Sequence, residues 1–157
     1  MMKKVKKLRV DKINYYLDIA EVVSKQSKCI RKHYGAVIVS KDDEIISTGF
    51  NDVCRGHLSC RELDGCNQDK ANSKHGDYSA CRAVHAEMNC IISASRKDMI
   101  GGTLFLVGIN SFTGKNYSQS ECCDICKKLI VNSGIETVIT RIEPLVYRIE
   151  NTKEWYL

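Results

Sequence analysis

Two stretches of the sequence decide both the fold and the chemistry: CRAVHAEMNCII at residues 81–92 and CCDIC at residues 122–126. The first supplies the imidazole of His85, and the second supplies the thiols of Cys123 and Cys126, three positions apart. Three nitrogen and sulfur ligands with a fourth position left open are typical of a catalytic zinc site, whereas a structural site is closed by four protein ligands. The two stretches therefore predict a zinc centre with room for one more ligand.

Both halves of this site fall where a loop or strand leads into the first turn of a predicted helix. Unpaired N–H groups at a helix start favour thiolate, so we expect lowered pKa values for Cys123 and Cys126. Water would occupy the fourth position, activated by the metal. Glu87, two positions beyond His85, is placed to move protons as a general acid and base. The alternative is a structural zinc knuckle, but a His-Ala-Glu segment 38 residues upstream of Cys123 favours catalysis.

Length and composition describe an ordinary globular protein. The 157 residues fit a single domain over residues 1–157, and the proportions of hydrophobic (43%) and charged (27%) residues are unexceptional. No apolar run approaches the roughly 20 residues needed to cross a bilayer, and no run of signal-peptide length follows the basic N-terminus. We expect a cytoplasmic protein with no membrane contact.

Charge and cysteine content say different things about partners. The net charge of +5 suits an anionic substrate such as a nucleotide, but four of the cations lie in the first seven residues. We interpret residues 1–10 as a solvated basic tail, so charge alone gives no reason to expect a nucleic-acid partner. The odd number of cysteines, nine, argues against a disulfide framework and for metal ligation.

The pattern of apolar residues predicts an α/β layer sandwich. In order, we expect a helix over residues 11–27, a hairpin of strands at 35–40 and 44–50, a helix over about 84–96, a strand at 103–109, a helix over 123–133, a strand at 135–140 and a short strand at 146–149. Asp11 is the expected N-cap of the first helix, and Gly134 is expected to end the third.

The buried faces of two helices can also be assigned from the sequence. For the second helix the expected face consists of Met88, Ile91, Ile92 and Ser95. For the third helix, Leu129 and Ile130 are expected to point inward.

Residues 51–80 form a long, irregular insert rich in glycine, cysteine and histidine. A loop of this length inside a compact domain is unusual unless it is functional or pinned, for example by a metal.

The H-x-E and C-x-x-C segments are the signature of zinc-dependent base deaminases. From about residue 11 to residue 155 the sequence resembles the deoxycytidylate deaminase family of the cytidine deaminase-like superfamily. The resemblance is carried by CIRKHYGAVIV (29–39), IISTGFN (45–51), CRAVHAE (81–87) and CDICKKLI (123–130). The 34 residues from Asn51 to His85 form a longer gap than is usual in tRNA adenosine deaminases, which favours a nucleotide substrate over tRNA.

The resemblance implies a three-layer α/β/α sandwich with a mixed central sheet of about five strands. It also implies zinc-dependent hydrolytic deamination of dCMP to dUMP, which would supply dUMP for thymidylate synthesis. Asn51 matches the residue that binds the sugar, a role favoured over the alternative of a turn residue that ends a strand. The backbone N–H of Ala86 matches the group that holds the pyrimidine carbonyl. Arg31, Arg55 and Arg82 are candidate phosphate ligands, or else ordinary surface arginines.

Members of this family are typically homo-oligomers, so a hexamer or a dimer is implied, with dCTP and dTTP as effectors and Mg²⁺ accompanying the allosteric nucleotide. Some members carry a second, structural zinc. The positions that match its ligands are Cys29, Cys60, Cys66 and Cys81, with His57 or His75 as a substitute for one thiol. Alternatively, the four are free cysteines that pack as small hydrophobes. Cys54, Cys90 and Cys122 are expected to be free thiols.

One position departs from the superfamily pattern. Cys122 stands where most members have proline, which would fix the backbone on the approach to the helix. The change could loosen the site or let Cys122 compete as a ligand. Two other functions therefore stay open: a deaminase of another cytosine or adenine substrate, such as a nucleoside or tRNA, and a catalytically weak, zinc-stabilised nucleotide-binding protein.

Overall fold

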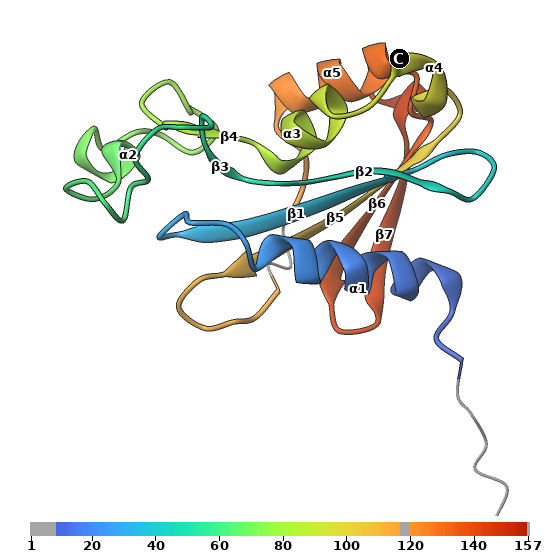
Figure 1. Cartoon of the computed structure of the whole chain (residues 1–157), viewed down its shortest axis with the longest axis horizontal. Coiled ribbons are helices and arrows are strands. Elements are labelled where there is room, and N and C mark those ends of the chain that lie inside the picture. The colour runs from blue at the N-terminus through green and yellow to red at the C-terminus, as the bar shows by residue number, and fades with distance from the viewer. Residues whose placement is uncertain (1–8, 117–119, 157) are drawn as a thin grey trace, which may run out of the picture.

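A mixed five-stranded sheet with helices on both faces forms the body of the protein (Figure 1), whose computed structural model describes residues 9–116 and 120–156. The elements in chain order are α1 (Lys12–Ser24), β1 (Lys32–Val39), β2 (Ile45–Phe50), β3 (Asp52–Val53), α2 (Asn67–Lys70), β4 (Ala83–Val84), α3 (Ala86–Ile92), α4 (Arg96–Met99), β5 (Thr103–Asn110), α5 (Asp124–Ser133), β6 (Thr137–Glu143), β7 (Val146–Asn151) and a 3₁₀ turn, η1 (Thr152–Glu154). Most of the basic tail predicted at residues 1–10 lies outside the described residues.

The strand order of the sheet is β2-β1-β5-β6-β7. The β5 and β6 strands are parallel, and every other neighbouring pair is antiparallel. The central strands β1 and β5 are continuous apolar runs because helices cover both of their faces. This arrangement confirms the predicted three-layer α/β/α sandwich with a mixed sheet.

Alternate residues of the central strands point to opposite layers. Val37 of β1 and Val107 of β5 pack with α1, whereas Ile38 and Leu106 pack with α3 and α5 on the other face. Figure 1 shows α1 alone on one side of the sheet and α3, α4 and α5 together on the other. His85, Cys123 and Cys126, the predicted zinc ligands, therefore lie on the face of the sheet covered by α3 and α5.

The predicted helix ends are confirmed where a side chain or glycine determines them. The Asp11 side chain accepts a hydrogen bond from the Asn14 N–H at 3.0 Å and so caps α1. Gly134 ends α5 in the left-handed conformation at φ 89°, which glycine adopts without a steric cost.

The prediction for the second helix was partly wrong. Two short helices, α3 and α4, replace one helix over residues 84–96, and the buried residues of α3 are Ala86, Glu87 and Cys90. Ile92 is 69% exposed and Ser95 is also exposed. The buried face is set by the close approach of α3 to β2 rather than by its largest side chains. In α5, Ile130 points inward as predicted, but Leu129 is 39% exposed.

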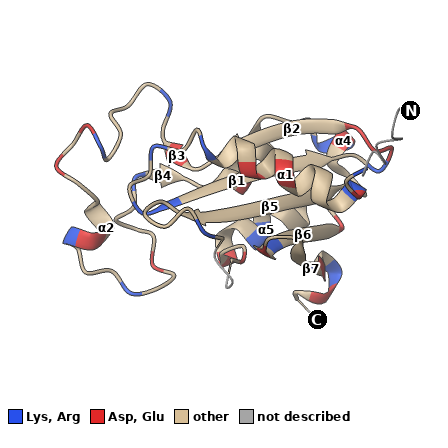
Figure 2. Ribbon diagram, turned by 90° about the horizontal axis from the view of Figure 1, so that it is seen from below, with Lys and Arg blue, Asp and Glu red and all other residues tan. Residues whose placement is uncertain are grey.

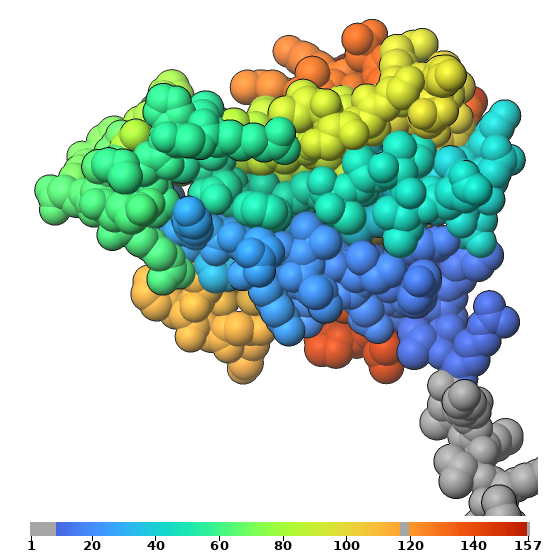
Figure 3. All heavy atoms as spheres, viewed as in Figure 1, coloured from blue at the N-terminus to red at the C-terminus, as the bar shows by residue number. Residues whose placement is uncertain are grey.

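The insert at residues 51–80 is irregular, as predicted, apart from β3 and the single-turn helix α2. The short strands β3 and β4 pair antiparallel and join the insert to the start of α3. In Figure 3 the insert forms a mass at one end of the molecule, beside the beginning of β1. None of the helices in the described ranges is long and apolar enough to span a bilayer.

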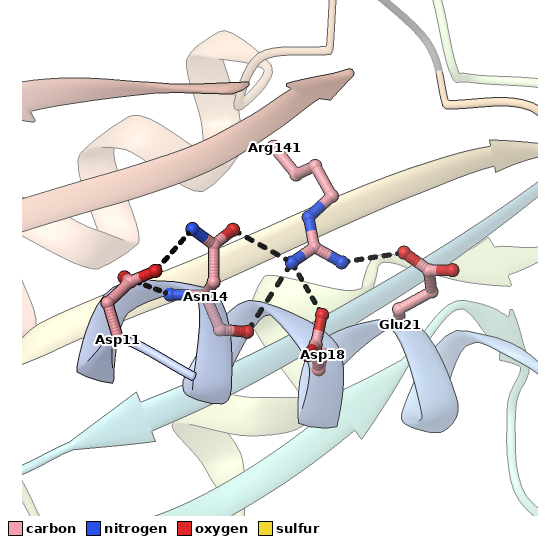
Figure 4. A network of polar contacts seen from close by, with 5 residues as sticks. All are labelled: Asp11, Asn14, Asp18, Glu21 and Arg141. Carbon is pink, nitrogen blue, oxygen red and sulfur yellow. Dashed lines mark hydrogen bonds and ion pairs between the residues drawn. The ribbon is translucent and has the colours of Figure 1, made fainter. Parts of the chain in front are cut away.

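A buried arginine connects the sheet to α1 (Figure 4). Arg141 of β6 is 4% exposed and donates hydrogen bonds to Asp18 at 2.7 Å and to Glu21 at 2.8 Å. It also reaches the backbone and side-chain oxygens of Asn14. The two carboxylates are accessible to water, with exposed side-chain fractions of 56% and 37%, whereas the guanidinium is not.

This asymmetry predicts unequal costs on the two sides of the ion pairs. Asp18→Asn combined with Glu21→Gln leaves a buried cation without an anion, and we expect a loss of about 3–5 kcal/mol in urea unfolding. Arg141→Met should cost less, because both carboxylates can be solvated. Glu136→Gln, which removes an exposed pair with Lys153, is the control and should cost at most about 1 kcal/mol. A double variant as stable as this control would contradict the prediction.

Candidate active site

His85 occupies the N-cap position of α3. Its backbone is extended, at φ −70° and ψ 156°, because β4 ends immediately before it. Ala86 and Glu87 follow as the first two helical residues and are both buried. Their N–H groups belong to the first turn, where no intrahelical acceptor is available. The imidazole, a carboxylate and an unpaired backbone donor therefore meet at one helix end.

Cys123 occupies the equivalent N-cap position of α5. Its sulfur accepts a hydrogen bond from the Cys126 N–H at 3.5 Å, which places both thiols at the start of the helix. Cys126 is fully buried, whereas Cys123 is partly accessible and lines a cavity.

The three predicted ligands come together in the fold. The Nδ1 atom of His85 lies 3.4 Å from the sulfur of Cys123 and 3.4 Å from that of Cys126. Zn–N and Zn–S bonds of ordinary length, arranged tetrahedrally, would separate nitrogen from sulfur by about 3.6 Å. All three atoms lie within 4.8 Å of one another, and across the described residues no other set of His, Cys, Asp or Glu ligand atoms is gathered this closely. The donor set and its spacing fit zinc.

Hydrogen bonds connect the His85 imidazole with the sulfurs of Cys123 and Cys126. A hydrogen bond from the Cys126 thiol, aided by one from His85, lowers the pKa of Cys123 to about 4. The same bond, together with burial, raises the pKa of Cys126, so the lowered pKa expected from the sequence was right for Cys123 and wrong for Cys126. The hydrogen bond to Cys123 also raises the pKa of His85. A divalent cation would displace these protons and bind both sulfurs as thiolates.

Glu87 is only 4% exposed, yet it lines the cavity beside the three ligands. Burial raises its pKa above the ordinary value, while its backbone hydrogen bond and the charge of His85 act in the opposite direction. A carboxyl group held with raised proton affinity next to an open metal position is suited to proton transfer.

The cavity has a volume of about 260 Å³ and is bounded by the start of β1, the insert and the N-terminal ends of α3 and α5. Tyr78 of the insert lines it, and its ring meets the His85 ring edge-on, with centroids 4.8 Å apart and planes at 87°. Tyr78 was not predicted from the sequence as a site residue. An aromatic residue inside an otherwise polar loop was the signal that could have identified it.

Asn51 and Ala86, the predicted sugar and base contacts, both line the cavity. The Asn51 side chain accepts a hydrogen bond from the Tyr34 N–H at 2.8 Å and donates one to the Lys32 carbonyl at 2.9 Å. These bonds fix its amide against β1, so the end-of-strand interpretation describes what it does for the fold. Asn51 also lines the cavity wall, which is compatible with sugar binding, and that role stays a prediction.

The candidate phosphate ligands separate in space. Arg31 lines the cavity beside His85 and is paired with Asp69 of α2 at 3.3 Å. Arg55 is exposed and lines a different hollow, together with Cys54 and His57, and Arg82 is half-buried. Figure 2 shows basic positions both at the start of β1 and in the insert. Three cavity-lining cations were not predicted: Lys28, Lys32 and Lys74.

The four cysteines proposed for a second zinc lie around the same cavity but are not gathered as closely as the first site. Cys29, Cys60, Cys66 and Cys81 all line the cavity wall. Burial, followed by the charges of the other three thiols, raises the pKa of Cys60, so the four are near neighbours. No three of their sulfurs lie within 4.8 Å of one another. A second zinc stays a prediction.

Comparison with known proteins agrees with this geometry. Residues 10–142 match the family described as the cytidine and deoxycytidylate deaminase zinc-binding region. The match includes every residue of the His85–Cys123–Cys126 site and most of the chain. The protein therefore belongs to the cytidine and deoxycytidylate deaminase family.

Two curated relatives are deoxycytidylate deaminases. The protein of Mycobacterium phage D29 is 36% identical over 135 residues, which cover 83% of this chain and 94% of the phage protein. The protein of Schizosaccharomyces pombe is 28% identical over 80% of this chain, but that match covers only 35% of the yeast protein. This chain therefore corresponds in length to the phage protein and to about a third of the yeast one.

Solved structures also resemble the chain. The apo form of dCMP deaminase from cyanophage S-TIM5 superposes with a TM-score of 0.59 at 25% identity, covering 85% of each chain. The form of the same enzyme in complex with dCMP and dUMP gives a TM-score of 0.57 at 25% identity and covers 90% of this chain and 84% of that one.

The close approach of α3 to the sheet yields a test of the site. A Cβ atom on Gly49 of β2 would lie 2.5 Å from the Ala86 carbonyl oxygen and 2.5 Å from the Cys90 nitrogen, both backbone atoms. We expect Gly49→Ala to displace α3, to cost about 1–3 kcal/mol of stability and to speed zinc loss to a chelator. Thr48→Ala, at the neighbouring exposed position, is the control. Zinc retention equal in both variants would contradict the expected displacement.

Proposed function

We propose that the chain catalyses hydrolytic deamination of dCMP to dUMP with release of ammonia. The observation that carries the proposal is the meeting of His85, Cys123 and Cys126 with the buried carboxyl group of Glu87 at the floor of a cation-lined cavity. Membership of the deaminase family and the names of the phage and yeast relatives support the reaction and the substrate.

His85, Cys123 and Cys126 would hold zinc and leave one position open toward the cavity. Zinc, when bound, would activate water by lowering its pKa to near neutrality. Glu87 would take one proton from the attacking water and deliver it to the pyrimidine ring nitrogen, which keeps it in the product. It would then carry the second water proton, from the added hydroxyl, to the departing amino group, so that the carbonyl of dUMP forms and ammonia leaves. Burial raises the pKa of the Glu87 carboxyl, which suits a group that must accept and return protons in turn.

The remaining cavity groups would orient the nucleotide. The N–H of Ala86 is free of any intrahelical acceptor and is directed by the helix start, so it can donate to the pyrimidine carbonyl. Asn51, fixed against β1, would face the sugar. Among the arginines of the described residues, Arg31 alone lines this cavity, so we assign it to the phosphate, with Lys28 and Lys74 nearby. Arg55 lines the neighbouring hollow and is the less direct candidate.

Ammonia release from dCMP, deoxycytidine and tRNA tests the substrate assignment. We expect turnover of dCMP, a much weaker reaction with deoxycytidine because it lacks the phosphate, and no reaction with tRNA. Arg31→Gln should raise the KM for dCMP and leave that for deoxycytidine nearly unchanged, with Arg55→Gln as the matched control. Activity confined to RNA would reject the proposal, and dCMP binding without ammonia release would establish a nucleotide-binding protein instead.

Glu87→Gln separates zinc binding from proton transfer. The amide keeps the size of the side chain but cannot accept and return a proton, so we expect kcat to fall by at least about 10²–10⁴-fold. Zinc content should stay at the wild-type level, because Glu87 is not one of the three ligands. The two measurements are steady-state ammonia release and zinc analysis of the same preparation. Turnover within tenfold of wild type would remove Glu87 from the mechanism.

We further propose that Cys29, Cys60, Cys66 and Cys81 close around a second, structural zinc that ties the insert to β1 and α3. The support is their common position on the cavity wall and the mutual effect of their charges. A structural zinc would draw the sulfurs closer together and order the insert.

Metal analysis tests the second site. We expect two zinc ions per chain in the wild type and one in Cys60→Ser combined with Cys66→Ser. Cys54→Ser should keep both, because Cys54 is exposed and lines the other hollow. A wild-type chain that holds a single zinc would leave the four cysteines as free thiols.

Assembly, effectors and location are proposed from the family. We propose a homo-oligomer, hexamer or dimer, that responds to dCTP and dTTP, with Mg²⁺ accompanying the effector nucleotide. The proposed zinc sites need six of the nine cysteines as thiolates, and none of the nine is paired in a disulfide, which fits a reducing compartment such as the cytoplasm. There the product dUMP would be available for thymidylate synthesis.

A further inference from the structure

The C-terminal strand contacts the segment that leads to the metal-binding cysteines. The Arg148 side chain of β7 donates a hydrogen bond to the Ser120 carbonyl at 2.6 Å and pairs with Glu150 at 3.2 Å. Because Arg148 and Glu150 are two positions apart in β7, their side chains lie on the same face of the sheet, the one that carries α3 and α5. A hydrogen bond from a charged donor is stronger than one between neutral groups, so this contact fixes the Ser120 carbonyl firmly.

The same C-terminal segment contacts the other side of the cysteine pair. The Trp155 indole N–H donates to Glu150 at 3.3 Å, and the Lys127 ammonium lies 5.5 Å from the centroid of the Trp155 ring. Lys127 directly follows Cys126 in α5. Arg148, Glu150 and Trp155 thus form a connected set, hereafter the C-terminal clamp, which reaches residue 120 before the cysteine pair and residue 127 after it.

Ser120 is also buried against β5 of the sheet. It is 1% exposed, and a Cβ atom on Gly108 of β5 would lie 2.6 Å from its hydroxyl oxygen. The absence of a side chain at Gly108 therefore provides the space in which Ser120 sits. With one end of the segment fixed, only Glu121 and Cys122 separate it from the first metal ligand.

We propose that Arg148 is a positioning residue that sets the geometry of Cys123 and Cys126. Proline at position 122 would restrict the backbone by fixing φ, whereas cysteine leaves φ free. In this chain the restriction comes from outside the segment, through the bond from Arg148 to Ser120 and the contact of Trp155 with Lys127. The inference rests on the proposed zinc site but not on the identity of the substrate.

The primary test is the rate at which a chelator removes zinc from the holoenzyme. We expect Arg148→Ala to release catalytic zinc about 10–100-fold faster, the range found when groups that orient metal ligands are removed. The kcat for dCMP should fall, with KM nearly unchanged, because the cavity cations are untouched. Lys153→Ala is the matched control: it lies in η1 of the same C-terminal segment but pairs with Glu136, and it should release zinc as the wild type does.

Rescue distinguishes positioning from general stabilisation. Cys122→Pro introduced into Arg148→Ala restores a backbone restriction at the same segment, so zinc release should return toward the wild-type rate. Urea unfolding of the metal-free proteins should show no such recovery. Unchanged zinc release in Arg148→Ala, or no recovery on adding Cys122→Pro, would overturn the inference.

If Arg148→Ala does not fold, zinc release is measured on Arg148→Lys instead, because a single ammonium cannot bond Ser120 and Glu150 as the guanidinium does. Faster zinc release from that variant supports the inference and an unchanged rate rejects it. Loss of zinc retention in a protein that never deaminates dCMP would support the clamp and reject only the proposed substrate.

Discussion

The site depends on the N-terminal ends of α3 and α5 lying side by side on one face of the sheet. His85 and Cys123 each occupy the N-cap position of one of these helices. This places the Nδ1 atom of His85 3.4 Å from the sulfur of Cys123 and 3.4 Å from that of Cys126. A helix start favours thiolate and offers backbone donors without intrahelical partners, so the same arrangement is suited to binding a cation and a pyrimidine carbonyl. The sheet lets α3 pack closely, since Gly49 offers no side chain where α3 crosses β2.

Much of this architecture could be predicted because its causes are local in the sequence. The continuous apolar runs of β1 and β5 predicted central strands, and Asp11 and Gly134 marked helix ends through their own backbone and side-chain preferences. The proximity of the two candidate metal-binding sulfurs could be predicted because a spacing of three residues at a helix start places both together whatever the surroundings. Family resemblance supplied the remaining link, from a zinc site to deamination.

Other features depend on long-range packing, which periodicity does not reveal. Ile92 looked like a core residue of α3, but the helix turns Cys90 toward the sheet because the backbone approach at Gly49 fixes its rotation. Tyr78 reaches His85 only because the insert folds back over the cavity. Arg31 and Arg55 looked equivalent in sequence, yet the two line different hollows. The contact between Arg148 and Ser120 joins positions whose relation depends on the order of strands in the sheet.

Anomalous diffraction at the zinc edge from crystals of the purified protein tests the central claim most directly. The account predicts a peak about 2.0–2.1 Å from the His85 nitrogen and about 2.3 Å from each of the Cys123 and Cys126 sulfurs, with a water molecule as the fourth ligand next to Glu87. A fourth protein ligand in place of water, such as the Cys122 thiol, would contradict it. So would a protein crystallised with zinc that shows no peak between the two helix ends.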